Sequence, residues 1–206
     1  MTAFGPVVTA PFPHIVGTWA GDVDLSTVLA EFPAPTDPRW RRYGNANEGK
    51  LEGPAVMWGP ATRELLAEMA AAAPAIAEVF GIPNLTMETA GGGYHLIPPG
   101  GHLGVHVDFN RSPRTDLYRR LNLLVYLNHD WTDPGGRLEL HDGAGVVREV
   151  APEFGTAVVF ETSDRSWHGH PRPADRWRFS VAAYFFSPDP PPGYSDDHST
   201  RWLTDA

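Results

Sequence analysis

The chain has 206 residues, a hydrophobic content of 42% and a formal net charge of −9, which suits one globular domain spanning residues 1–206. The negative charge argues against a general nucleic-acid binder, because phosphate contacts require clustered Lys and Arg. The sequence contains no cysteine, which excludes disulfides and thiolate metal sites and leaves His and carboxylate as the metal ligands.

The first part of the chain predicts helices. Apolar residues recur at helical spacing over 25–32 and again over 59–81, where Gly81 is a plausible end and Pro74 divides the segment in two. We therefore expect a helical N-terminal support over about residues 20–82. No signal-peptide pattern and no apolar run of about eighteen residues is present, so we expect a cytoplasmic protein that contacts no membrane.

From residue 84 onward, short alternating runs are separated by Gly, Pro and Asp. Many short strands with no helix between them indicate a sandwich or barrel with helices packed on one face of the sheet. The Pro-rich C-terminal tail is expected to be extended. The candidate strands are 85–90, 93–98, 103–109, 120–128, 137–141, 146–150, 156–161 and 178–186.

The stretch "GVHVDF" predicts half of a metal site. In a strand, the side chains of His106 and Asp108 share one face, about 6.6 Å apart along the strand. A second histidine would come from "SDRSWHGHP", which offers His168 or His170. Two His and one carboxylate form the facial triad of non-haem Fe(II) oxygenases, although a His-x-Asp pair alone is common by chance.

The hydrophobic strand "RWRFSVAAYFF" begins close to Arg178, and Ser180 lies on the same face two residues later. A buried guanidinium is costly unless a carboxylate meets it. That carboxylate is either an acidic residue of the protein or part of a ligand, and the sequence leaves both open.

Together these motifs resemble the Fe(II)- and 2-oxoglutarate-dependent dioxygenases, in their prolyl-4-hydroxylase-like branch. The resemblance also includes "RRLNLLVYLNHDW", "GGRLEL" and the closing "RWRFSVAAYFF", and it covers about half of the chain, from Gly91 to Pro188. It implies a mainly β fold with flanking helices, a double-stranded β-helix (jelly roll, cupin-like), with its core over about residues 84–188. One departure is that Leu96 or Ile97 stands where the branch often has a Tyr.

The resemblance also implies roles for individual residues. His106, Asp108 and His168 would bind Fe(II), with His168 preferred to His170 for its spacing from Arg178. The cosubstrate 2-oxoglutarate would be bound by Arg178, Tyr126, Ser180 and Leu138. Asn122 faces the same way as Tyr126 on its strand, which adds it to the candidates that line the cosubstrate site.

The resulting hypothesis is an oxygenase that uses Fe(II), 2-oxoglutarate and O₂ to hydroxylate a C–H bond of a small molecule, such as an amino acid or a natural-product intermediate, and releases succinate and CO₂. The polar loop after the His-x-Asp strand suggests substrate contacts. Candidate substrate residues are Arg111, Arg114, Tyr118 and Trp167. The alternatives are a hydroxylase of a protein or peptide residue and, outside the class, a cupin-type metal- or sugar-binding β-sandwich.

Overall fold

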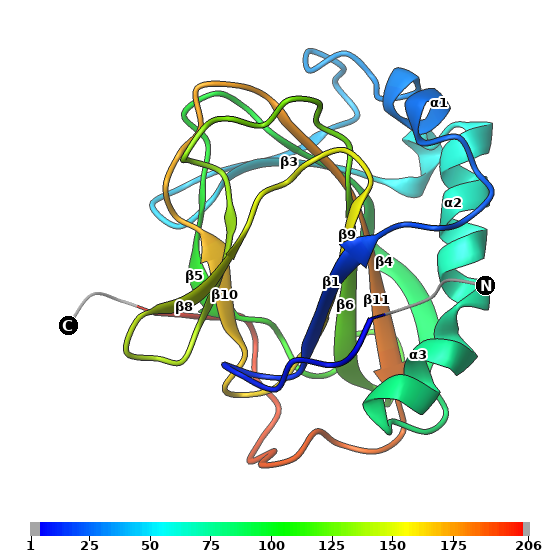
Figure 1. Cartoon of the computed structure of the whole chain (residues 1–206), viewed down its shortest axis with the longest axis vertical. Helices are drawn as coiled ribbons and strands as arrows, with labels where there is room; N and C mark the ends of the chain where they lie inside the picture. Colours follow the sequence, from blue (N-terminus) through cyan, green and yellow to red (C-terminus); the bar gives the residue numbers. More distant parts are fainter. Residues whose placement is uncertain (1–4, 204–206) are drawn as a thin grey trace.

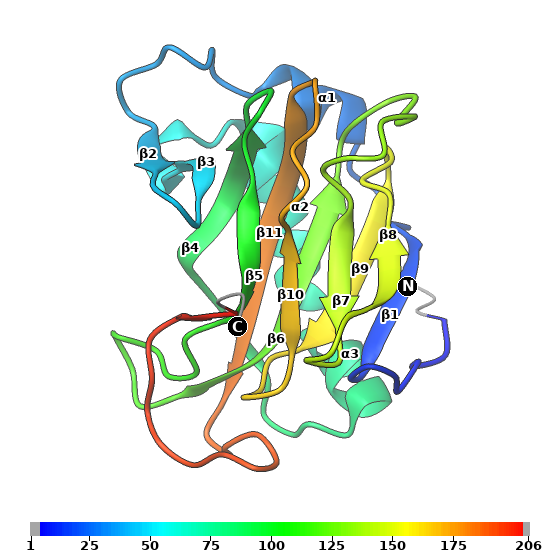
Figure 2. The ribbon, with the colours of Figure 1, turned by 90° about the vertical axis from the view of Figure 1, so that its left-hand side faces the viewer.

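The computed structural model describes residues 5–203, without the side chains of residues 89 and 90. Two antiparallel sheets face each other across the molecule (Figures 1 and 2). The larger sheet has the strand order β1-β9-β6-β11-β4-β3-β2 and the smaller one the order β12-β5-β10-β7-β8. Two facing sheets with flanking helices confirm the predicted jelly-roll fold.

The strands of the larger sheet are β1 (His14–Thr18), β2 (Arg41–Gly44), β3 (Gly49–Gly53), β4 (Thr86–Ile97), β6 (Tyr118–Tyr126), β9 (Thr156–Glu161) and β11 (Arg178–Ser187). Those of the smaller sheet are β5 (Leu103–Val107), β7 (Leu138–His141), β8 (Val146–Val150), β10 (Trp167–His170) and β12 (Arg201–Trp202).

The helices are α1 (Leu25–Ala30), α2 (Pro60–Ala71) and α3 (Ala73–Phe80), with a short 3₁₀ turn at Ala55–Met57. The predicted break is confirmed: Ala72 separates α2 from α3, and Pro74 lies in the first turn of α3, where its missing N–H removes no hydrogen bond. Gly81 ends α3 in a left-handed conformation, with a φ of 65°. None of the helices within residues 5–203 combines the length and the apolar character needed to cross a membrane.

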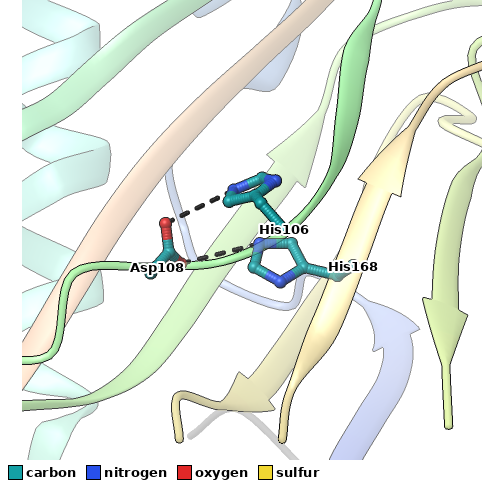
Figure 3. Close-up of side chains that lie close together, drawn as sticks. All are labelled: His106, Asp108 and His168. Carbon is teal, nitrogen blue, oxygen red and sulfur yellow. Dashed lines mark ion pairs between the residues drawn. The ribbon is translucent and has the colours of Figure 1, made fainter. Parts of the chain in front are cut away.

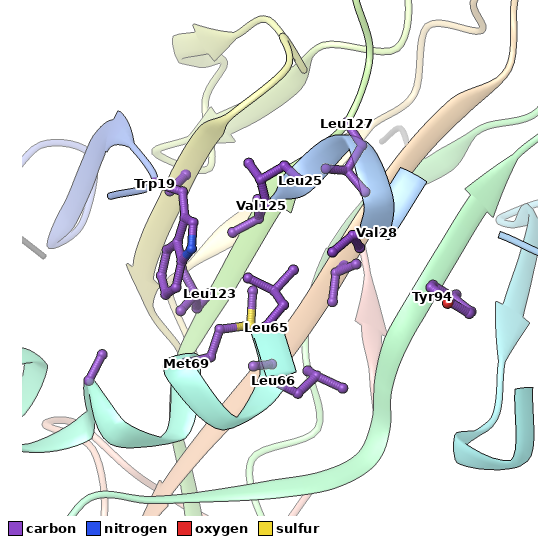
Figure 4. Packing of buried hydrophobic residues seen from close by; sticks show 14 of the residues in the cluster. Trp19, Leu25, Val28, Leu65, Leu66, Met69, Tyr94, Leu123, Val125 and Leu127 are labelled. Carbon is purple, nitrogen blue, oxygen red and sulfur yellow. The ribbon is translucent and has the colours of Figure 1, made fainter. Parts of the chain in front are cut away.

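The helices cover the outer face of the larger sheet (Figure 1). Side chains alternate along β6, so that Leu123 and Val125 pack against Leu65 and Met69 of α2 (Figure 4). All four side chains are fully buried. Asn122 and Tyr126 lie on the opposite face of β6 and point into the space between the two sheets.

The structure differs from the predicted strands at several places. Segments 85–90 and 93–98 form one continuous strand, β4, whose register against β11 shifts near Gly93. β1 and β10 lie outside the predicted strands. Residues 41–53 fall within the predicted helical support, and they form a β2–β3 hairpin that joins the larger sheet next to β4. The C-terminal tail returns to the smaller sheet, where β12 pairs with β5.

Candidate functional site

Three ligand-type side chains meet between the two sheets. His106 lies on β5, Asp108 follows that strand, and His168 lies on β10 (Figure 3). One donor atom from each residue lies within 4.8 Å of the other two. Both Nε2 atoms are 3.5 Å from an oxygen of Asp108, and all three residues are buried. The structure thus brings together the residues that the sequence predicts as a metal site.

Backbone carbonyls fix the direction of both imidazoles. Nδ1 of His106 is 2.9 Å from the carbonyl oxygen of Gly104. Nδ1 of His168 is 2.8 Å from the carbonyl oxygen of Ser166. Because the Nδ1 proton is donated to a carbonyl, each Nε2 keeps its lone pair and faces Asp108. Histidine ligands in protein metal sites are commonly oriented by such a hydrogen bond from the ring nitrogen that does not bind the metal.

An irregular strand pairing places the two histidines side by side. His168 pairs with His106, but His170 pairs with Leu103, so β5 has one extra residue between the two pairs. Gly169 lies between them, where an added Cβ would be 2.7 Å from the carbonyl oxygen of Gly104. A residue larger than glycine would push β10 away from β5 and separate the two imidazoles.

Two further side chains hold the carboxylate. Asp108 Oδ2 accepts a hydrogen bond from Asn122 Nδ2 at 2.8 Å and pairs with Arg119 Nη2 at 3.1 Å. Arg119 is buried and also lies over the ring of Tyr184, with its Cζ 3.7 Å from the ring centroid. Burial acts to raise the pKa of Asp108, but Arg119 and the two histidines outweigh it and hold that pKa well below its usual range.

These features fit a divalent metal ion. The carboxyl of Asp108 is ionised, and burial lowers the pKa of His168 to about 3, so its imidazole is neutral, as a metal ligand must be. Donor atoms 3.5 Å apart are close to the spacing of adjacent ligands around an ion bound at about 2.1 Å. One carboxylate and two imidazoles are the donor set of a non-haem Fe(II) centre with open positions.

Arg178 lies in the same pocket as the His-Asp-His cluster. It is buried, donates from Nε to the carbonyl oxygen of Gly136 at 2.8 Å, and donates from Nη2 to the hydroxyl of Tyr126 at 3.2 Å. Within residues 5–203, no carboxylate lies within ion-pair distance of it. Of the two options that the sequence leaves open, the structure therefore favours a ligand carboxylate.

The remaining predicted cosubstrate residues have different surroundings. Ser180 and Leu138 line the pocket beside Arg178. Asn122 also lines it, but its amide is bound to Asp108 and its oxygen accepts from Arg119 Nε at 2.9 Å. The contacts of Asn122 are therefore with Asp108 of the His-Asp-His cluster and with Arg119.

The predicted substrate residues lie outside this pocket. Arg111 pairs with Asp116 and Asp197, Arg114 is exposed, and Tyr118 packs edge-on against Tyr194. Trp167 precedes His168 on β10 and therefore points to the other face of the strand. The structure does not bring these four side chains together with the His-Asp-His cluster, and their contact with a substrate stays a prediction.

The sequence assigns no role to several residues that line the pocket, namely Lys50, His95, Arg119 and Tyr184. His170 also lines the pocket, but the sequence offers it only as an alternative metal ligand to His168. Strand alternation could have placed it on the same face as His168, but β10 lies outside the predicted strands. Trp202 of β12 also lies beside the cluster, with its ring 5.0 Å from that of His106, and nothing in the tail sequence indicated this pairing.

Comparison with known proteins gives a consistent picture. The family model described as the 2OG-Fe(II) oxygenase superfamily matches residues 92–186. No curated protein matches. The match begins within β4 and ends within β11, so it includes the His-Asp-His cluster and Arg178. It favours an oxygenase over the cupin-type alternative.

Solved structures share the fold at low sequence identity. A prolyl-4-hydroxylase from Pseudomonas putida is 24% identical, with a TM-score of 0.60 over 83% of this chain and 91% of that one. A prolyl hydroxylase from Trichoplax adhaerens, solved with a hypoxia inducible factor peptide fragment, is 17% identical, with a TM-score of 0.60 over 84% of this chain and 83% of that one. A viral collagen prolyl hydroxylase from Paramecium Bursaria Chlorella virus-1 is 13% identical, with a TM-score of 0.57 over 91% of this chain and 97% of that one.

The fold, the His-Asp-His cluster and the family match agree with the resemblance found in the sequence. Residues 92–186 of this chain are similar to the 2OG-Fe(II) oxygenase superfamily, a family that uses Fe(II), 2-oxoglutarate and O₂, and the His-Asp-His cluster lies within this segment.

Proposed function

We propose that the chain hydroxylates a C–H bond of a small molecule, such as an amino acid or a natural-product intermediate, and releases succinate and CO₂. His106, Asp108 and His168 would bind Fe(II), and Arg178 would bind the distal carboxylate of 2-oxoglutarate. The observation that carries this proposal is a buried guanidinium without an acidic partner among the described residues, in the same pocket as a buried His-Asp-His cluster.

Each residue has a defined task in this proposal. The bound metal and 2-oxoglutarate supply the oxidising chemistry, and the protein supplies position and electrostatics. Arg178 and the hydroxyl of Tyr126 hold the carboxylate, while Arg119 and Asn122 keep Asp108 ionised and oriented. Leu138 and Phe160 line the same pocket and exclude water from the reacting groups.

A polar wall supports a small polar substrate. Lys50 on β3 and His95 on β4 line the pocket. A cationic group and an imidazole on this wall suit a small molecule that carries a carboxylate group, such as a free amino acid.

A second candidate function is hydroxylation of a peptide or protein residue. It is favoured by one observation: structurally similar chains are prolyl hydroxylases, and one of them was solved with a peptide. Their identity to this chain is at most 24%, so the shared fold alone does not decide between the two substrate classes.

The cosubstrate assignment can be tested by binding. Protein loaded with Mn(II), which does not oxidise as Fe(II) does, is titrated with 2-oxoglutarate by calorimetry. We expect Arg178→Ala to weaken binding by about 30-fold or more, because it removes a buried charge partner of the carboxylate. Arg176→Ala is the matched control, since Arg176 is exposed, donates to the backbone carbonyls of residues 129 and 130, lies over the ring of Trp131 and does not line the pocket. Equal binding by Arg178→Ala and wild type would contradict the assignment.

The substrate class needs a separate experiment. Fe(II)-loaded protein is given 2-oxoglutarate, O₂ and either single amino acids or proline-containing peptides, and succinate and product mass are measured. Succinate release that rises with an amino acid, together with a mass gain of one oxygen, would support the small-molecule proposal. The same response to peptides alone would favour the second candidate.

A further inference from the structure

The proposed function leaves one buried polar group in the pocket without a task, the imidazole of His170. Trp167 and Gly169 alternate with His168 and His170 along β10, so both imidazoles face the space between the sheets. His170 is only 3% exposed. Its Nδ1 has no hydrogen-bond partner among the residues that the structure describes. A buried polar atom without a hydrogen-bond partner destabilises the folded protein unless a ligand or water pairs with it.

The strand registers place His170 and Arg178 at the same end of the pocket. His170 pairs with Leu103 at the start of β5, and Arg178 pairs with Ile97 at the end of β4. Only residues 98–102 separate β4 from β5, so both pairs lie at one end of the molecule. His170 belongs to the smaller sheet and Arg178 to the larger one, and both line the same pocket. The side chains of His170 and Arg178 therefore enter the same end of the pocket from opposite sheets.

The chemistry of this end is that of a carboxylate site. The pocket's acidic residue is Asp108, which is already engaged by Arg119 and Asn122. At the other end are the guanidinium of Arg178, the hydroxyl of Ser180 and the free imidazole of His170. A guanidinium and an imidazole N–H both donate, and a carboxylate oxygen has lone pairs for both.

We propose that His170 is a positioning residue that donates a hydrogen bond to the carboxylate bound by Arg178, and so increases selectivity for a 2-oxo acid with a distal carboxylate. This inference rests on the proposed function, which places the distal carboxylate of 2-oxoglutarate at Arg178. It adds a donor from the smaller sheet, so the carboxylate is held from both walls.

The test compares two 2-oxo acids of equal chain length. Mn(II)-loaded wild type, His170→Phe and His170→Leu are titrated by calorimetry with 2-oxoglutarate and with 2-oxopentanoate, which lacks the distal carboxylate. We expect both variants to bind 2-oxoglutarate about 10- to 100-fold more weakly, the range for a lost hydrogen bond to a charged group. Binding of 2-oxopentanoate should change by less than about twofold, because it offers no carboxylate to His170.

His129→Phe is the matched control, because His129 is exposed and stacks on Phe154 outside the pocket. It should bind both acids as wild type does. The proposal is overturned if the His170 variants weaken both acids equally, which would indicate a packing role, or if they weaken neither. The use of two apolar replacements of different shape guards against one of them failing to fold. Failure of the proposed function would look different: the Mn(II)-loaded wild type itself would not prefer 2-oxoglutarate.

Discussion

The two faces of the larger sheet have opposite compositions, although the same strands build both. The outer face of β6 and β11 joins the helices in one continuous apolar cluster that includes Leu121, Leu123, Val181 and Phe185. The inner face has two smaller apolar clusters, one around Phe160 and one around Phe186. The pocket with its charged and polar side chains also opens on this inner face.

Because of this difference, residues of the outer face contribute mainly to stability and polar residues of the inner face contribute mainly to function. The outer face gains free energy from apolar burial, which is roughly proportional to the area removed from water. The inner face contains polar groups that cost free energy unless they are paired. The polar groups of Asp108, Arg119 and Asn122 pair with one another. Among the described residues, in contrast, Arg178 has neutral partners and no carboxylate, and Nδ1 of His170 has no hydrogen-bond partner.

The largest effect is expected from Asp108→Ala. We expect it to abolish Mn(II) binding and also to lower the free energy of unfolding by about 3–5 kcal/mol, because Arg119 stays buried without its partner. Metal titration and urea denaturation measure the two effects. In the double variant Asp108→Ala/Arg119→Leu, most of the stability should return without the metal site. A single variant as stable as wild type would show that the pair does not compensate the charge of Arg119.

The helix-covered face should respond in the opposite way. Leu65→Ala removes a side chain that is 0% exposed in the outer cluster, and we expect it to lower the free energy of unfolding by about 2–5 kcal/mol. At urea concentrations where the variant is still folded, its Mn(II) affinity should stay within about twofold of that of wild type. The exposed neighbour Ala67 provides the control, because Ala67→Ser should change stability by less than about 0.5 kcal/mol. A large loss of metal affinity in Leu65→Ala would contradict the idea that the outer face affects stability without affecting the metal site.

A smaller effect is expected from the residue that orients the carboxylate. Asn122→Ala removes the 2.8 Å hydrogen bond to Asp108, and we expect Mn(II) affinity to fall by about 10- to 100-fold, as for outer partners of metal ligands. Asn128→Ala is a sharp control: the amide of Asn128 contacts backbone groups of residues 152 and 179 instead. It should reduce stability and leave metal affinity unchanged, and equal affinity losses in both variants would contradict a specific role for Asn122.

The smallest effect concerns the pH dependence of stability. Burial, followed by the charge of Lys50, lowers the pKa of His95 from 6.5 to about 4. Below pH 6.5 the unfolded chain takes up a proton that the folded protein does not bind, so the free energy of unfolding falls as the pH falls toward 4. In metal-free protein, His95→Gln should reduce the loss of unfolding free energy between pH 7 and pH 6 by about 0.7 kcal/mol.

Urea denaturation at the two pH values measures this difference. His129→Gln, a change at the exposed surface, should leave the wild-type difference unchanged. If His95→Gln also has no effect, the imidazole of His95 is not kept neutral by its surroundings.

Local patterns in the sequence determined much of this protein. The break between α2 and α3 follows from Pro74, and the end of α3 follows from Gly81. Alternation along β5 placed His106 and Asp108 on one face, and the structure finds an Nε2–carboxylate distance of 3.5 Å between them. These features depend on residues close together in the chain, where propensity and periodicity act directly.

The tertiary structure alone decided what completes the pocket. Phe185 pairs with Leu121 but Phe186 pairs with Arg119, so Arg120 is an extra residue in β6. This bulge turns Arg119 to the face of Asn122, whereas strict alternation would have turned it toward the helices. Likewise, the pairing of β12 with β5 brings Trp202 beside His106. The face on which these side chains lie depends on the register between strands distant in sequence, and a periodic pattern within one strand does not contain that register.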